Sequence, residues 1–587
     1  MGRKRKNRGG KIVDHQHHDG QHPIEEDPLT IKSSWFGDEI KWVSCHDNGR
    51  KEESSSSLQR YPSINDGSGG SINSTANDIA ELPSTHQSLT KELNQLKEQF
   101  MPLAKSCADA INNYNNSITS VNNATNNKSK TATTPQYEFR QARSICNPHE
   151  RFGDISIRPH RYNNSKRRRH HDSNKKSSSS FQFVNRSAIK LANIDALLGF
   201  VLTRCQQSPS SSSSSSSDTK TLLAIDTTPL SNTNDETTYF AFVDLCGAPG
   251  GFSEYILYRH MHPIHQHHVG EQKSADNTDS HSKEGGGTQH ASNNSIIPCY
   301  GFGMSLSGRN DEGKGVRWDL NHLKKHYHLQ STEDLSSANT IDVTTKEDSN
   351  ATLSNNKCNN KKQLLYYHVC RGADGTGSIY NWDNVLELQR QVSMHLSRQN
   401  DADFDDNKKN ELTQQHHKVH LVVADGGFDA QRDSNNQEEL AHHIVVSQTA
   451  AALSLLREGG TFIVKMFGFH EESTKQMLRY VYGCFDKMTF VKPTSSRPAS
   501  AERYLVCCGY DGVGSGWDGL AWKQHQMDIM TKSSTILPNE VVYDCTPLDN
   551  LANEFDLDML KLNVESCRSI VDYLRKKRED AQREQSD

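Results

Sequence analysis

The sequence has few of the residues that build a hydrophobic core. Only 33% of its 587 residues are hydrophobic and 7% are aromatic, and the mean hydropathy is −0.81. A chain of this composition leaves long segments without a packed core. Length alone allows two to four domains at ~100–200 residues each. The low hydrophobic content indicates that the folded part is one mid-sized domain with a small extension.

Several signatures of other protein classes are also missing. The sequence has no run of about 18 apolar residues, which argues against a transmembrane helix, and the basic N-terminus lacks the apolar segment of a signal peptide. The 13 cysteines include no Cys-x-x-Cys pair, and most of the 29 histidines lie in polar segments without ligand spacing. We therefore expect no metal site and a soluble intracellular protein with reduced thiols.

The net charge of −5 argues against binding of a polyanion by the whole chain, but the charge is unevenly distributed. Two dense basic clusters are "RKRKNRGGK" (Arg3–Lys11) and "SKRRRHH" (Ser165–His171). Such clusters bind nucleic acid or act as nuclear import signals. The alternative is a solvated basic tail.

Changes in composition divide the chain into three parts. Residues 1–136 are expected to be largely disordered, with a helix at 89–114 interrupted by Pro102 and an apolar island at Trp35–Val43 that could dock elsewhere. Residues 137–510 are expected to form a catalytic domain, and residues 511–587 a partly helical extension of it. Polar inserts near 208–218, 261–296, 329–362 and 400–417 are expected to be disordered surface loops.

Apolar runs alternate with helical patterns from Phe183 onward. Phe183–Cys205 reads as an amphipathic helix. Strands that alternate with helices predict an α/β fold with a mainly parallel, seven-stranded sheet. The last two strands follow one another without a helix, which predicts an antiparallel hairpin at one edge. The predicted strands are Ala241–Cys246, Pro298–Met304, Leu364–Cys370, Val419–Ala424, Thr461–Phe467, Lys487–Val491 and Tyr504–Cys508, and the clearest later helices are Trp382–Gln399, Gln437–Arg457 and Glu472–Cys484.

The segment "FVDLCGAPGGFSEY" (Phe242–Tyr255) reads as a strand, a tight turn and the start of a helix. Ligands of open α/β sheets bind at this edge. The turn has neither GxGxxG nor GxxxxGK[ST], which argues against a nicotinamide or triphosphate site, and Pro249 removes an amide donor that a pyrophosphate would need. A turn of this kind suits S-adenosylmethionine, whose methionine part passes close to the backbone. A plain strand–turn–helix corner is the alternative.

Four charged residues stand in apolar surroundings. Asp425 ends the strand of "VHLVVADGGFD", and Lys465 lies inside "GGTFIVKMF". Glu502 stands at a strand entrance, and Lys190 lies on the apolar face of "RSAIKLANID". Each could be half of a buried ion pair. Their number at one sheet edge favours a functional site.

Methyl transfer to a ribose 2′-hydroxyl suits this group, because the hydroxyl must lose its proton to a base poised near neutral pH. A lysine reaches that condition when it is desolvated and lies near another cation. Lys465 is therefore the candidate base, and Asp425 would hold its amine. Lys190 would orient the hydroxyl, and Glu502 would fix Lys190 or the ribose.

Five segments resemble, in order, the motifs of the FtsJ-like ribose 2′-O-methyltransferases: "FVNRSAIKLANID", "DLCGAPGGFSEY", "VVADGGF", "GGTFIVKMF" and "SSRPASAERYLVC". The resemblance implies a Rossmann-like fold, S-adenosylmethionine as cofactor, and a Lys-Asp-Lys-Glu tetrad formed by Lys190, Asp425, Lys465 and Glu502. "GFGMSL", "TSSRPASAERY" and "NVESC" are most similar to the eukaryotic members that act on the first transcribed nucleotide of capped mRNA. That implies a nuclear enzyme acting on capped mRNA, beside RNA polymerase II or the capping machinery.

The resemblance also implies ligand contacts. An acidic residue usually follows the third strand; this chain offers Asp374, whereas the aligned position is Ser378. Gly468 stands where the family often has an acid. An rRNA or tRNA ribose methyltransferase and a catalytically inactive RNA-binding module are the alternatives. The implied cofactor contacts are Asn185, Cys246, Gly247, Ala248, Pro249, Gly250, Gly251, Phe252, Asp374, Ser378 and Ile379, and the implied substrate contacts are Arg143, Asn435, Asn436, Gln437, Glu502 and an upstream lysine, Lys128.

Overall fold

The computed structural model of the chain describes residues 34–37, 39–44, 82–121, 132–147, 183–203, 239–262, 297–306, 318–327, 329, 365–397, 418–427, 437–513, 517–531 and 544–586. The two basic clusters lie outside the described residues, as do Lys128, Asn435 and Asn436. The four predicted inserts also lie outside them, apart from their margins.

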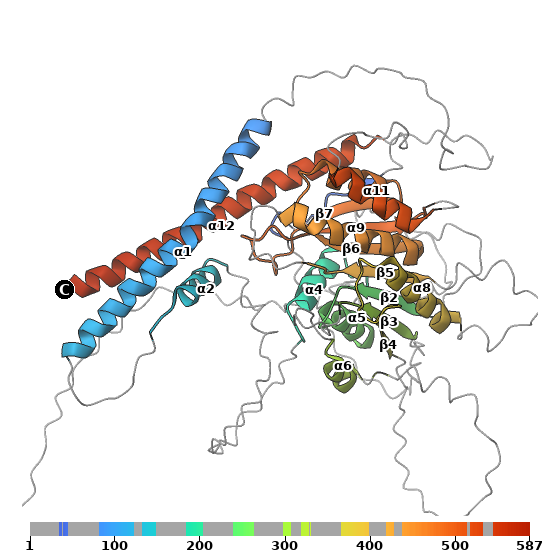
Figure 1. The fold of residues 1–587 in the computed structure, drawn as a ribbon, viewed down its shortest axis with the longest axis horizontal. Helices are drawn as coiled ribbons and strands as arrows, with labels where there is room; N and C mark the ends of the chain where they lie inside the picture. The colour runs from blue at the N-terminus through green and yellow to red at the C-terminus, as the bar shows by residue number, and fades with distance from the viewer. Residues whose placement is uncertain are drawn as a thin grey trace, which may run out of the picture.

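An eight-stranded sheet lies at the centre of the molecule (Figure 1). In spatial order its strands are β1 (Val43–Ser44), β7 (Phe485–Val491), β8 (Arg503–Tyr510), β6 (Leu456–Met466), β5 (Val419–Ala424), β2 (Phe240–Leu245), β3 (Cys299–Met304) and β4 (Leu365–Cys370). The five strands from β6 to β4 are parallel, whereas β8 is antiparallel to both β6 and β7. The mainly parallel sheet and the β7–β8 hairpin are as predicted.

The predicted strand number, seven, is wrong because of β1. Its two residues pair antiparallel with Met488 and Lys487 of β7, so a segment from the N-terminal region covers the sheet edge. Trp35 anchors the same segment, since its backbone N–H donates to Lys492 and its indole Nε1 donates to the Ser496 carbonyl at 2.9 Å. The apolar island therefore docks on the sheet, close to the predicted tetrad.

Helices cover both faces of the sheet, because its central strands alternate large apolar side chains between two buried surfaces. In β2, Phe242 faces one hydrophobic cluster and Val243 faces the other. One face carries α4 (Ser187–Leu197), α5 (Gly251–Met261) and α6 (Leu320–Tyr327). The other carries α8 (Trp382–Ser397), α9 (Gln437–Leu455), α10 (Glu472–Tyr482) and α11 (Gly519–Thr531).

Helix α4 differs from its sequence-based prediction. We predicted one apolar face, but the helix is buried on most sides, and even Asn193 and Asp195 have no exposed surface. Both polar side chains have partners: Asp195 accepts from the Leu202 amide and the Thr203 hydroxyl, and Asn193 accepts from Thr494. Satisfied polar groups inside a packed interior look like a solvent-facing stripe in sequence alone.

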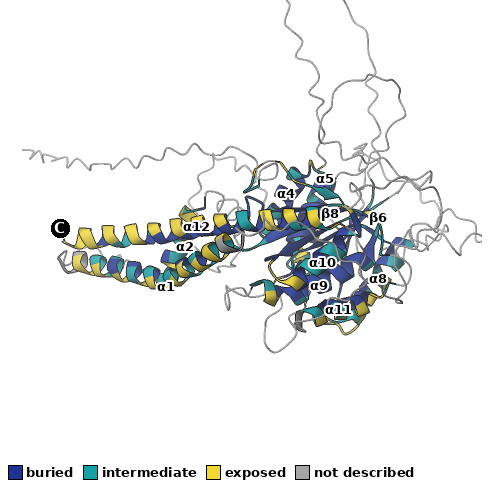
Figure 2. Ribbon diagram, turned by 90° about the horizontal axis from the view of Figure 1, so that it is seen from above, coloured by how far each residue is buried: buried dark blue, intermediate teal, exposed yellow. Residues whose placement is uncertain are grey.

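Three helices form an arm that extends from the sheet (Figures 1 and 2): α1 (Leu82–Val121), α2 (Pro135–Ile145) and α12 (Thr546–Ser586). Helix α1 packs along α12 through Leu93, Leu96, Leu560 and Val564. It runs through Pro102 without a break, contrary to the predicted interruption. A proline costs an interior helix about 3 kcal/mol, and we attribute the tolerance of Pro102 to this interhelical packing.

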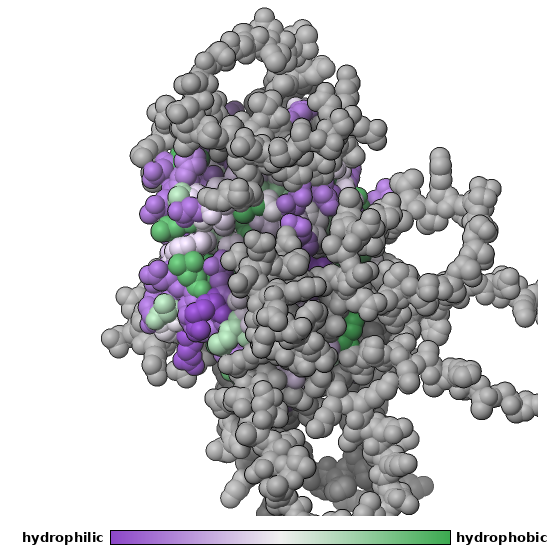
Figure 3. All heavy atoms as spheres, turned by 90° about the vertical axis from the view of Figure 1, so that its right-hand side faces the viewer, coloured by the Kyte–Doolittle hydropathy of each residue, from purple (hydrophilic) through white to green (hydrophobic). Residues whose placement is uncertain are grey.

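Among the helices that the structure describes, none combines the length and the apolar character needed to cross a bilayer. On the face shown in Figure 3, hydrophilic residues are interspersed with isolated hydrophobic ones.

Candidate active site

The four predicted tetrad residues form two ion pairs at one edge of the sheet. Lys465 Nζ lies 3.0 Å from Asp425 Oδ1, and Lys190 Nζ lies 2.7 Å from Glu502 Oε2. All four side chains are between 11% and 14% exposed. Lys465 is directly opposite Tyr504 in the β6–β8 ladder, which brings the two pairs together. The structure thus gathers all four residues, and their catalytic roles stay predictions.

The surroundings of Lys465 differ from those expected of a neutral base. Burial opposes the ammonium charge, but the carboxylates of Asp425 and Glu502 outweigh it and raise the pKa of Lys465. The ammonium also donates to the Asp425 carbonyl oxygen at 2.8 Å. We predicted a lysine poised by a nearby cation; the structure instead places two anions beside it, so in the free protein Lys465 is charged at neutral pH.

Glu502 lies among three lysines. Burial opposes its charge, but Lys190, Lys465 and Lys492 together hold the pKa of the Glu502 carboxyl well below its usual range. Lys492 is fully buried, and its ammonium donates to the carbonyl oxygens of Ser500 and Glu502 at 2.7 and 2.5 Å. Burial lowers the pKa of Lys492 to about 7, with Glu502 acting against this shift. Lys492 thus fixes the loop that carries Glu502 through hydrogen bonds made in the protein interior.

Sequence reasoning missed the polar residues that position the tetrad. Ser187 Oγ donates to Asp425 Oδ2 at 2.5 Å, and Tyr504 Oη donates to Asp425 Oδ1 at 3.2 Å. Ser496 Oγ donates to Glu502 Oε1 at 2.8 Å. A signal was available for Ser187, because it precedes Lys190 by three residues and so shares its helix face. Ser496 and Tyr504 lie in a motif that was recognised, but only their contacts reveal a role.

The predicted cofactor turn lies directly beside Asp425. The Asp425 amide donates to the Leu245 carbonyl at 3.3 Å, at the carboxyl end of β2. The chain then turns sharply, with φ of +57° at Cys246 and +114° at Gly250, the N-cap of α5. Ala248, Pro249 and Phe252 complete this turn and the start of the helix. A glycine-rich turn therefore lies at the carboxyl edge of the sheet, next to the Lys465–Asp425 pair.

Two glycines of the turn stand where there is no room for a side chain. A Cβ on Gly247 would lie 1.9 Å from Asp244 Oδ1, and one on Gly251 would lie 1.9 Å from Asn185 Oδ1. Asn185 Oδ1 also accepts the Ser187 amide at 3.0 Å, and so connects the turn to the residue that binds Asp425. Asp244 Oδ1 is a buried oxygen without a hydrogen-bond partner among the described residues. Each of these glycines is thus required by a polar side chain that packs on the turn, and Asp244 Oδ1 keeps an acceptor there that no described residue uses.

The turn after β4 contains two candidate contacts for the far end of the cofactor, Asp374 and Ser378, and their surroundings differ. Asp374 is exposed and its carboxylate closes the turn, accepting from the Thr376 amide and hydroxyl and from Asn381 Nδ2 at 2.7–2.9 Å. Hydrogen bonds from Asn381 and Thr376 hold the pKa of Asp374 well below its usual range. Ser378 is half-buried, and the neighbouring Gly377 packs on the Ser305 carbonyl after β3. Because the Asp374 oxygens are already engaged, Ser378 and the buried Ile379 are the better candidates.

The predicted substrate residues are spread more widely. Gln437 is the first residue of α9, which follows the strand of Asp425 in the chain. Arg143 lies on α2 in the helical arm, with its guanidinium 5.2 Å from the centroid of the Phe139 ring. The arm contacts the tetrad loop through Ala499, three residues before Glu502. Arg143 thus belongs to the arm, which packs against the loop that carries Glu502.

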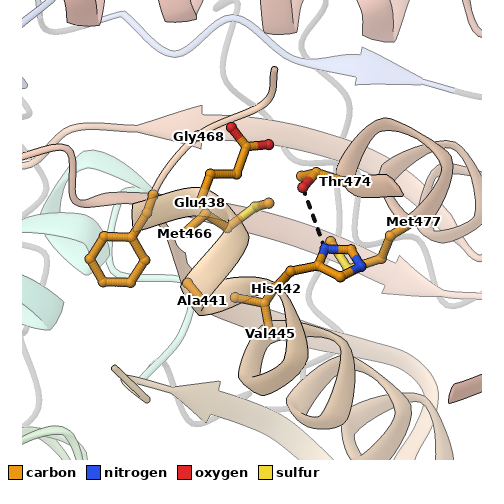
Figure 4. A pocket seen from close by; sticks show the side chains of 9 residues that line it. Glu438, Ala441, His442, Val445, Met466, Gly468, Thr474 and Met477 are labelled. Carbon is orange, nitrogen blue, oxygen red and sulfur yellow. Dashed lines mark hydrogen bonds between the residues drawn. The ribbon is translucent and has the colours of Figure 1, made fainter. Parts of the chain in front are cut away.

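A separate small pocket lies between α9, α10 and the end of β6 (Figure 4). Its lining is mostly apolar and includes Ala441, Val445 and Met477. The acidic residue on its rim, Glu438, accepts the backbone N–H groups of His470 and Glu471 at 3.0 Å each. Since this carboxylate is used in fixing a loop, the tetrad edge is the stronger candidate for catalysis.

Comparison with known proteins agrees with this geometry. A model of the FtsJ-like methyltransferase family matches residues 301–510, which include Asp425, Lys465 and Glu502. The chain contains an FtsJ-like methyltransferase domain. The match begins within β3, so Lys190 and the glycine turn precede it; Lys190 contacts Glu502, and Leu245 before the turn contacts Asp425, both in the matched region.

Curated relatives of the FtsJ-like domain carry related names. The chain is 26% identical over 74% of its length to a protein of Drosophila melanogaster named cap-specific mRNA (nucleoside-2′-O-)-methyltransferase 1, and spans 36% of that relative. It is 23% identical over 63% of its length to a Caenorhabditis briggsae protein named inactive cap-specific mRNA (nucleoside-2′-O-)-methyltransferase 1B, and spans 29% of it. The chain thus spans about a third of these relatives.

Among solved structures, a putative ribosomal RNA methyltransferase from Plasmodium falciparum is 14% identical. It covers 47% of this chain and 88% of its own, with a TM-score of 0.22. This score is too low to indicate a shared arrangement, so the family match and the sheet described above define the fold.

Proposed function

We propose that this chain transfers a methyl group from S-adenosylmethionine to the ribose 2′-hydroxyl of the first transcribed nucleotide of capped mRNA. The observation that carries the proposal is the pair of buried ion pairs, Lys465–Asp425 and Lys190–Glu502, beside a bare glycine turn. The family match supports methyl transfer. The name of the Drosophila relative supports the capped substrate.

In this proposal Lys465 Nζ would accept the proton of the 2′-hydroxyl as its oxygen bonds to the methyl carbon, and the bond from that carbon to the donor sulfur would break to leave a neutral thioether. Asp425 fixes the amine at 3.0 Å, and Ser187 and Tyr504 fix Asp425. Lys190, held by Glu502, directs the hydroxyl and stabilises the negative charge that develops on its oxygen. Lys465 must first release a proton to solvent, because Asp425 and Glu502 keep its pKa raised in the free protein.

The residues at the glycine turn would hold the methyl donor. Gly247, Gly250 and Gly251 form the turn against which Asp244, Trp318 and Asn185 pack, and Asn185 presents a side-chain amide next to Gly251. Ser378 and Ile379 would contact its far end. When bound, S-adenosylmethionine supplies a methyl group on a positively charged sulfur. Positive charge near Lys465 opposes the effect of the two carboxylates and lowers the lysine pKa, which favours the neutral amine when the donor is present.

Residues outside the tetrad would bind the RNA substrate. Arg143, Gln437, Asn435 and Asn436 are proposed contacts to the capped RNA. The basic clusters Arg3–Lys11 and Ser165–His171 support a nuclear location. We further propose that the protein acts beside RNA polymerase II or the capping machinery, where a new cap first becomes available.

Matched RNAs test the proposed substrate. The full chain is incubated with labelled S-adenosylmethionine and one transcript in two forms, m7G-capped and uncapped with a 5′-triphosphate. Incorporation into the capped form alone supports the proposal. Parallel reactions contain uncapped rRNA or tRNA; incorporation there, with none at the cap-proximal ribose, would show a ribose methyltransferase of a different substrate class.

An inactive RNA-binding module is the second candidate, because one relative is named inactive. A protein of that kind has no need to keep the tetrad, yet all four positions are filled and paired here. Single-turnover methylation that disappears in Lys465→Met would exclude the inactive reading. Tight RNA binding without any methyl transfer would favour it.

A further inference from the structure

Three side chains with metal-ligand atoms meet between the helical arm and the methyltransferase domain. His86 lies on α1, Asp556 on α12, and His470 in the loop between β6 and α10. The Nε2 atoms of His86 and His470 lie 3.1 and 2.9 Å from Asp556 Oδ2, and the three ligand atoms are all within 4.8 Å of one another. Their separation in sequence explains why spacing gave no sign of them.

Two of the three ligand separations are close to those of a zinc site. Zinc bonds to histidine nitrogen and carboxylate oxygen measure about 2.0–2.2 Å, so neighbouring ligands of a tetrahedral ion lie roughly 3.3 Å apart. The two measured nitrogen–oxygen separations are close to that value. The imidazole rings meet edge to face, with centroids 4.4 Å apart and planes at 71°. Both rings therefore direct a nitrogen at the same oxygen from different sides.

Two of the three ligand side chains have a second contact of the kind that orients metal ligands, and the backbone of the third is fixed. Arg503 binds the other carboxylate oxygen of Asp556. Thr90 Oγ1 lies 3.4 Å from His86 Nδ1, and Glu438 accepts the backbone N–H of His470 at 3.0 Å. The Asp556 side chain is only 7% exposed, so a charged ligand is already desolvated and oriented.

We propose that His86, His470 and Asp556 bind a zinc ion, with water at the fourth position. Access for water follows from the exposure of the histidine side chains, which is 29% for His86 and 49% for His470. The ion fastens the arm to the domain. It also acts close to the tetrad, because His470 follows Lys465 by five residues and Arg503 adjoins Glu502.

Metal competition tests the site in the full chain. Protein freed of metal by a chelator is titrated with zinc in the presence of a competing indicator, which keeps weak sites in histidine-rich segments from being counted. Wild type is expected to hold one tightly bound zinc more than the His86→Asn/His470→Asn variant. His525→Asn, on α11, makes the same chemical change elsewhere and should match wild type. Thr90→Val should weaken binding about tenfold, the effect expected of an outer-shell partner.

Two further readouts use the same proteins. Zinc is expected to raise the Tm of wild type and of His525→Asn, but not that of the double histidine variant. Cobalt(II) in the site should give d–d absorption without a thiolate charge-transfer band, since no cysteine is among the ligands. Equal zinc stoichiometry and affinity in wild type and the double variant would overturn the proposal. It would also be overturned by a thiolate band for the tightest site, because the metal would then lie at cysteines.

Discussion

Because two carboxylates surround Lys465, we expect the rate of methyl transfer to depend steeply on pH. A proton acceptor must be neutral, but Asp425 and Glu502 raise the pKa of Lys465 above its ordinary 10.5 despite its burial. At pH 7.5 the amine is then neutral in fewer than roughly 1 in 1000 free molecules. The neutral fraction grows tenfold with each pH unit, as long as the pH stays below the pKa.

When both substrates are far below saturation, the rate reports the free protein. We therefore expect the apparent second-order rate to rise about tenfold per pH unit from pH 6.5 to 9, without a plateau. At saturation the bound donor cation lowers the lysine pKa, so kcat should level off at a lower pH. The assay is initial-rate transfer of labelled methyl to capped RNA across this range.

Two substitutions separate proton transfer from positive charge. Lys465→Met should lose about 10²–10⁴-fold in rate, the usual contribution of a general base. Lys465→Arg should be equally poor, because a guanidinium cannot give up its proton near neutral pH. Lys475→Met, on α10, is the control and should keep its rate. A flat second-order rate between pH 7 and 9, or an active Lys465→Arg variant, would refute a base role for Lys465.

Two further substitutions probe the neighbouring contacts. Glu502→Gln should destabilise the protein by about 3 kcal/mol in urea unfolding, because it leaves the buried Lys190 without its partner; Glu387→Gln, which breaks the more exposed pair with Arg390, should cost under about 1 kcal/mol. Equal costs would contradict the burial argument. Gly251→Ala should weaken S-adenosylmethionine binding at least tenfold in calorimetry, because its Cβ would displace Asn185. Gly199→Ala is the control: a Cβ there meets open space, but the φ of +69° should cost about 1–2 kcal/mol of stability, and the affinity for S-adenosylmethionine should not change. Unchanged affinity in Gly251→Ala as well would exclude the turn as the donor site.

The strands could be predicted because their signal is local. Val419–Ala424 was predicted to the residue, since a buried parallel strand is a continuous apolar run between breaks. β1 could not be found in this way, because two residues carry no periodic pattern and their partner strand lies more than 400 positions later. Pro102 was misjudged for the same reason: the packing against α12 that accompanies it comes from the other end of the chain.

The tetrad shows a similar division. The residue types and their places, three at strand ends and Lys190 on a helix, were visible in sequence, and the structure pairs Lys465 with Asp425 and Lys190 with Glu502. The charge state of Lys465 was not visible, because it depends on the balance between burial and two carboxylates at distances that only the fold sets. Ser187 and Ser496, which hold the two carboxylates, look in sequence like any other serines.

Selective removal of one hydroxyl tests the central claim most directly. Two synthetic m7G-capped RNAs differ only in which ribose lacks its 2′-hydroxyl, the first transcribed nucleotide or the second. With labelled S-adenosylmethionine, we predict that transfer is abolished on the first RNA and unchanged on the second. Persistent labelling of the RNA without the first 2′-hydroxyl would contradict the assignment of that ribose as the acceptor.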